Sequence, residues 1–66
     1  MNRETIAKKL TALRGDRSPQ EAANAVGISV SALWMYENGK RVPRDEIKMK
    51  LAEHYNTTVE DLFFSE

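Results

Sequence analysis

The chain has 66 residues, 41% of them hydrophobic and 30% charged, with a formal net charge of zero; this length and composition predict one folded domain, residues 1–66. The sequence contains no Cys and a single His, which excludes a disulfide framework and a zinc site with thiolate or His ligands. No apolar run approaches the roughly 20 residues of a membrane span and no signal-peptide core is visible, so we expect a cytoplasmic protein without membrane contact.

The first two predicted helices have clear start and stop residues. The first is expected from a capping Asn2 to about Arg14, before a Gly-Asp pair. Its apolar stripe at helical spacing is Ile6, Leu10 and Leu13. The second begins at SPQE, residues 18–21, which reads as a capping box with Pro at the first helical position, and Gly27 ends it. Its inward residues are expected to be Ala22, Ala23, Ala25 and Val26.

Three further helices are predicted in the second half of the chain. Ser29 caps a third helix that ends before Gly39, and a fourth helix runs from about Arg44 to Tyr55. Thr58 begins a weaker capping box that opens a fifth helix. Two-residue alternation is confined to a few positions, so strands are not expected. The prediction is therefore an all-α, compact five-helix bundle.

The connection between the second and third helices is the most informative stretch. Gly27-Ile28-Ser29 joins two capped helices by a tight turn, and small residues on the first of them allow close packing. This is the arrangement of a helix-turn-helix, in which the second helix stands out from the domain and fits the DNA major groove. Free N–H groups at the helix starts are suited to bind phosphates.

The motifs SPQE, A-x-x-V-G-I-S, E-N-G-K-R-x-P and the final L-F occur in this order in residues 18–63. The segment resembles the Cro and lambda-repressor-like helix-turn-helix family, of the xenobiotic-response-element type. The resemblance implies a five-helix, lambda-repressor-like DNA-binding fold with the helix-turn-helix in helices 2 and 3. It also implies a homodimer on a palindromic operator of double-stranded DNA.

The resemblance also implies roles for individual residues. The helix capped by Ser29 would enter the major groove, and Glu37 at its end would pair with Arg14. Arg44 would lie toward the dyad. The groove-facing residues would be Val30, Ser31, Ala32, Trp34 and Met35. The phosphate backbone would lie against Ser18, Pro19, Gln20, Lys40 and Arg41.

The groove-facing positions depart from the family pattern, because many relatives carry Gln, Asn or Arg there. Apolar side chains can contact thymine methyl groups, which project into the major groove, and we hypothesise such a readout. Two interpretations are open for Trp34, whose ring either faces DNA or covers a neighbouring helix. Val30 likewise either reads a base or packs against Val26.

A dimer contact is predicted at the C-terminal end. Phe64 is the main candidate, with Phe63 and Tyr55 near it, and the alternative is that the two Phe residues close the bundle of the monomer. Ordinary helix surface is expected for Lys8, Lys9, Lys48 and Lys50.

The zero net charge conceals an asymmetry. Residues 1–50 hold all ten Lys and Arg against six acids, a net +4, whereas residues 51–66 hold four acids and no Lys or Arg, a net −4. Such asymmetry favours an oriented polyanionic partner. We predict a transcriptional regulator, a repressor, with no catalytic activity, cofactor or small-molecule ligand. The alternatives are a DNA-binding antitoxin or restriction-modification controller, and a protein-interaction module without DNA binding.

Overall fold

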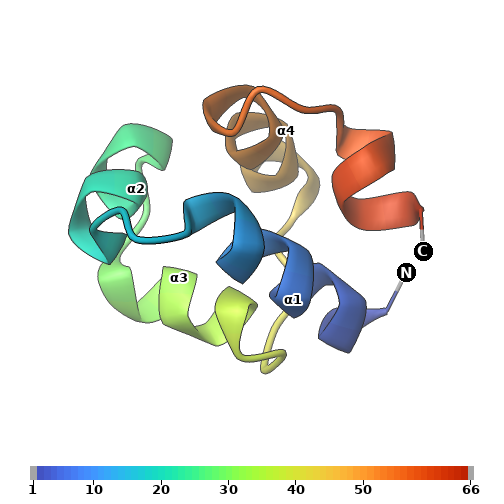
Figure 1. Ribbon diagram of the computed structural model, residues 1–66, viewed down its shortest axis with the longest axis horizontal. Helices are drawn as coiled ribbons and strands as arrows, with labels where there is room; N and C mark the ends of the chain where they lie inside the picture. Colours follow the sequence, from blue (N-terminus) through green and yellow to red (C-terminus); the bar gives the residue numbers. More distant parts are fainter. Residues whose placement is uncertain (1, 66) are drawn as a thin grey trace.

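The computed structural model describes residues 2–65, which form five helices and no strand. Four are α-helices and the last is a π-helix, packed around one core (Figure 1). The predicted all-α fold with five helices is confirmed, and the observed bounds lie within one or two residues of the expected ones. In chain order the helices are α1 (Arg3–Arg14), α2 (Pro19–Val26), α3 (Val30–Glu37), α4 (Asp45–His54) and η1 (Glu60–Phe64).

The predicted caps start the first three helices. The side-chain oxygen of Asn2 accepts hydrogen bonds from the first turn of α1, at 2.8 and 3.1 Å. The hydroxyls of Ser18 and Ser29 accept from backbone N–H groups of α2 and α3, at 3.4 and 3.0 Å. Each cap satisfies a donor that has no partner within its helix. Arg44 precedes α4 without a side-chain cap.

Left-handed residues follow the ends of α2 and α4. Gly27 has φ 84° and Asn56 has φ 57°, values that Gly adopts freely and Asn tolerates better than most residues. The Gly27 N–H closes α2 on the carbonyl of Ala23 at 2.9 Å. Gly27 is the predicted stop of the second helix, and Asn56 directly follows Tyr55, the expected last residue of the fourth.

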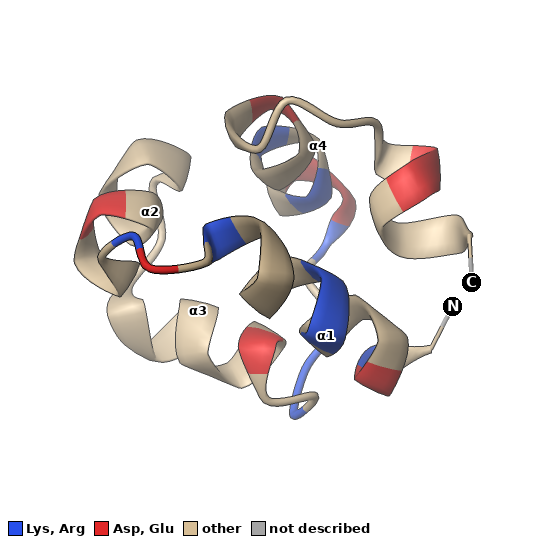
Figure 2. Cartoon of the chain, viewed as in Figure 1, with Lys and Arg blue, Asp and Glu red and all other residues tan. Residues whose placement is uncertain are grey.

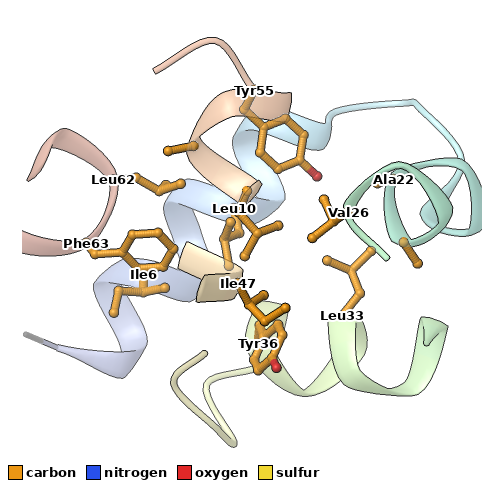
Figure 3. Close-up of a cluster of buried hydrophobic side chains, with 13 residues drawn as sticks. Ile6, Leu10, Ala22, Val26, Leu33, Tyr36, Ile47, Tyr55, Leu62 and Phe63 are labelled. Atoms are coloured by element: carbon orange, nitrogen blue, oxygen red, sulfur yellow. The ribbon is translucent and has the colours of Figure 1, made fainter. Parts of the chain in front are cut away.

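The core draws side chains from all five helices (Figure 3). Leu10 and Leu51 are 0% exposed. The small residues Ala22 and Ala23 are buried with Val26, so that α2 lies close to both α3 and α4. Ala25, expected on the same face, is exposed, because the helical rotation turns it away from the other three.

The last helix differs from the expected one in type and in its contacts. The N–H of Ser65, the residue after η1, donates to the carbonyl of Glu60 at 2.9 Å, and this spacing of five residues is that of a π-helix. The Lys9 ammonium reaches the carbonyls of Asp61 and Ser65 at 2.7 and 2.6 Å. Lys9 was expected on ordinary surface. It instead connects α1 to the C-terminal turn, where a cation is favourable near free carbonyls.

The aromatic residues at this end require a correction to the predicted dimer contact. Tyr55 and Phe63 are 7% and 2% exposed and belong to the core of the monomer, whereas Phe64 is 55% exposed. Burial raises the pKa of the Tyr55 hydroxyl above its ordinary value. Tyr55 and Phe63 therefore offer almost no surface to a partner, because the monomer itself covers them.

Lys48, also expected on the surface, is 6% exposed. Its ammonium lies 3.5 Å from a carboxylate oxygen of Asp45 and 5.3 Å from the ring centre of Phe64. An aliphatic stem of this length can be buried while the charge retains partners, so helical spacing alone does not reveal such a lysine.

Candidate nucleic-acid interface

The turn between α2 and α3 is built as the sequence predicts. Gly27 takes the left-handed conformation, Ile28 is partly buried against the core, and Ser29 caps α3. Val26 and Leu33, on either side of the turn, are both buried in the core (Figure 3). The start of α3 is thereby held by its own cap and by the packing of the preceding helix.

The two sides of α3 have different surroundings although both are apolar. Leu33 and Tyr36 are buried, at 1% and 8% exposure, on the side facing the bundle. On the outward side Trp34 is 55% exposed, and Val30, at the flank between the two sides, is 36% exposed. Ser31 beside them is exposed as well. The apolar outward side of α3 is therefore a surface feature and not a second part of the core.

The exposure of Trp34 argues against the interpretation that its ring covers a neighbouring helix, and its contact with DNA stays a prediction. A ring that covered a neighbouring helix would be mostly hidden, whereas more than half of Trp34 is accessible. The outward residues Val30, Ser31, Trp34 and Met35 line a shallow hollow of about 310 Å³, which we call the α3 hollow. Because Val30 lines the α3 hollow, part of the Val30 side chain is accessible from outside.

Two of the predicted groove-facing residues lie at the edges of this surface. Ala32 is half-buried and packs against the core, so it offers less surface than predicted. Met35 is half-buried but contributes to the α3 hollow. Ser29 is exposed, and its hydroxyl is occupied by the Ala32 N–H. These three residues frame the surface that Val30, Ser31 and Trp34 present.

An ion pair holds the far end of α3 to α1. The Arg14 guanidinium donates to both carboxylate oxygens of Glu37, at 2.8 and 2.9 Å, and a third bond reaches the carbonyl of Arg17 at 2.8 Å. The two side chains are only 18% and 8% exposed. The hydrogen bonds with Glu37 raise the pKa of Arg14. The pair predicted from the family resemblance is confirmed, and it neutralises the one charged residue of α3.

Cations gather in the loop after α3. Lys40 and Arg41 are exposed, and the Lys40 N–H donates to the carbonyl of Met35 at 2.9 Å, which folds the loop against the end of the helix. Figure 2 shows this loop as basic and α3 as uncharged apart from one acidic turn. Arg41 and Arg44 both line a second hollow of about 400 Å³ beside the turn residues Gly27 and Ile28.

One further basic residue lies in this region without having been predicted from the sequence. The Arg3 guanidinium lies 3.4 Å from the carbonyl of Lys40 and so adds a further cation beside the loop. The two residues are 37 positions apart, and no local pattern relates them.

The three residues predicted to contact phosphate at the start of α2 are all exposed, namely Ser18, Pro19 and Gln20. The Ser18 hydroxyl caps the helix, and the Gln20 amide donates to the side chain of Asn24 at 2.8 Å. Each amide nitrogen carries two hydrogens, so Gln20 keeps one donor for a second acceptor.

Comparison with known proteins identifies the family to which the chain belongs. A family model described as helix-turn-helix matches residues 6–62, from within α1 to within η1. The chain belongs to the helix-turn-helix family. The match is to the Cro and lambda-repressor-like type, so the resemblance inferred from the motifs is confirmed. The searches of curated proteins and of solved structures returned no match.

Membership assigns this helix-turn-helix protein to DNA-binding transcription regulation, in a family of regulators that is typically non-enzymatic. Across residues 2–65, the helices are all too short or too polar to cross a bilayer. In the same range, the acidic residues and His54 form no group of three or more that could hold a metal ion.

Proposed function

We propose that this protein is a sequence-specific repressor that binds a palindromic operator as a homodimer and reads it through α3. The observation that carries the proposal is the outward side of α3, which is exposed, uncharged and bordered by basic residues. Base edges in the major groove would meet Val30, Ser31 and Trp34. The regulated genes would be silenced when the bound dimer excludes other proteins from the site.

Phosphate contacts would orient α3 in the groove, because such contacts fix position and carry no sequence information themselves. Lys40, Arg41 and Arg44 supply the charge, and Ser18 and Gln20 lie at the start of α2. The zero net charge does not oppose this arrangement, since residues 1–50, which hold all of these groups, carry a net +4, and the acids that bring the total to zero lie in residues 51–66.

Selection from random duplex DNA tests the proposal. We expect enrichment of a palindrome whose half-sites are one helical turn apart, roughly 34 Å. A Ser31→Arg variant is the matched control: it keeps the fold but places a cationic donor in the groove, so it should enrich a different half-site. Failure of the wild-type protein to enrich any palindrome would refute sequence-specific binding.

Binding to the selected operator should weaken steeply with salt. Three basic residues in each protomer give six phosphate contacts per dimer, which predicts a loss of about a thousandfold in affinity between 50 and 200 mM salt. Fluorescence anisotropy at several salt concentrations measures the slope. Replacing Lys40 and Arg41 by Gln should reduce it, whereas Lys8→Gln, an exposed change on α1, should leave it unchanged.

A second function, binding a protein instead of DNA, is favoured by two observations: the α3 hollow is apolar, and the net charge of the chain is zero. An apolar contact responds little to salt, so the slope distinguishes the two functions. A flat dependence, together with no enriched duplex, supports the protein-binding module.

The proposed dimer contact is now reduced to Phe64. Its ring is 55% exposed, and burying part of it from both protomers would contribute about 2 kcal/mol to association. We therefore expect Phe64→Ser to raise the dimer dissociation constant by roughly thirtyfold in sedimentation equilibrium. Met49→Ser, at a residue 64% exposed on α4, is the control and should leave association unchanged. Equal association of both variants would place the interface elsewhere.

A further inference from the structure

The α3 hollow has few means of forming hydrogen bonds. Among its four lining residues the polar side-chain atoms are the Ser31 hydroxyl and the indole N–H of Trp34. The bidentate contacts by which Arg recognises guanine and Gln or Asn recognises adenine need side chains that the hollow lacks. Its surface is otherwise composed of the methyl groups of Val30, the Trp34 ring and the thioether of Met35.

The surroundings of the hollow limit what can occupy it. The basic loop begins directly beside it, because the Lys40 N–H bonds to the carbonyl of Met35 at 2.9 Å. The Glu37 carboxylate is bound on both oxygens by Arg14 and adds no free negative charge. A ligand that suits the site presents a small apolar group on an anionic framework.

We propose that the α3 hollow receives the C5-methyl group of a pyrimidine in the major groove, so that thymine and 5-methylcytosine are accepted in place of each other. This inference rests on the proposed DNA-binding function and specifies the chemical group that α3 recognises. The methyl group is the one apolar group that base pairs display in the major groove. Methylation of a cytosine in the operator would then strengthen binding instead of leaving it unchanged.

The expected size of the effect follows from the burial of one methyl group. Removing a buried methyl group from water strengthens binding by about fourfold. A two-fold operator presents the same position twice, so loss of both methyl groups should weaken binding by roughly fifteenfold. Effects of this size are measurable by fluorescence anisotropy at constant salt.

The test uses the full chain and the duplex selected from random DNA. At the position found to be sensitive, four bases are compared: thymine, uracil, cytosine and 5-methylcytosine. Each thymine is replaced in turn by uracil, which removes the methyl group and keeps the base pair. At the sensitive position, the T·A pair is then replaced by C·G and by 5-methylcytosine·G. We expect uracil to weaken binding about fourfold per half-site, and 5-methylcytosine to bind about fourfold per half-site more tightly than cytosine.

Variants connect the effect to the hollow. Trp34→Ala and Val30→Ala should bring the ratio of thymine to uracil affinity toward one, while the salt slope stays that of the wild type. Met49→Ala, on α4, should leave the ratio unchanged. Equal affinity for thymine and uracil at every position would overturn the inference and leave the regulator function standing. Absence of any enriched duplex would overturn both.

Discussion

We expect Leu10→Ala to lower the free energy of unfolding by about 3–5 kcal/mol, the largest effect of any change considered. Leu10 is 0% exposed in the core shared by the five helices, so truncation removes buried apolar surface and leaves a cavity. A domain of this size has a total stability of about 5 kcal/mol, so the variant should keep no more than about 2 kcal/mol of it and should unfold at much lower urea concentration than the wild type. Urea denaturation followed by far-UV circular dichroism measures the change.

Met49→Ala is the matched control for this prediction. It also shortens an apolar side chain on a helix, but that side chain is 64% exposed, and the expected change is within about 0.5 kcal/mol. If both variants unfolded at the same urea concentration as the wild type, the described core packing would be wrong.

The second large effect is expected from Glu37→Ala, which should destabilise the protein by about 2–3 kcal/mol. The change leaves the Arg14 guanidinium, only 18% exposed as a side chain, without the two oxygens that now accept its hydrogen bonds. Because the pair joins α1 to the end of α3, DNA affinity should fall even at temperatures where the variant remains folded. Chemical denaturation and operator binding are measured on the same samples.

Two further variants separate this pair from ordinary surface charge. Glu46→Ala removes an exposed carboxylate that lies 3.6 Å from Lys50, and it should change stability by no more than about 0.5 kcal/mol. Replacing both Arg14 and Glu37 by Leu removes the pair without leaving a buried charge, and should recover most of the stability lost in Glu37→Ala. Glu37→Ala and Glu46→Ala of equal stability would show that the pair is not structurally important.

Together these contacts explain how so small a chain can present α3 without distorting it. Gly27 and Ser29 determine where α3 begins. Arg14, 23 positions earlier in the sequence than Glu37, holds the end of α3 through its ion pair with that residue. Leu33 and Tyr36 hold the inward side, at 1% and 8% exposure. On the outward side, Val30, Ser31 and Trp34 are exposed, so these side chains are accessible for the proposed contact with DNA.

The local structure and the family of this protein follow from short stretches of its amino-acid sequence. The caps Ser18 and Ser29 each accept from an N–H group three positions away, and Gly27 and Asn56 act through their own backbone angles. These are short-range effects that need no knowledge of the rest of the chain. They predict the five helices and the tight turn. The ordered motifs indicate the family, and the resemblance to it implies the groove-facing residues.

Which apolar and charged side chains are covered depends on how the helices pack, and short stretches of sequence do not predict it. Tyr55 and Phe63 are in the core while the adjacent Phe64 is exposed, and Trp34 is open to solvent although its helix is apolar on both sides. Lys9 donates hydrogen bonds to carbonyls of the C-terminal turn, which lies more than 50 positions away in the sequence. Burial and such contacts depend on which helix packs against which, and residues far apart in sequence determine this.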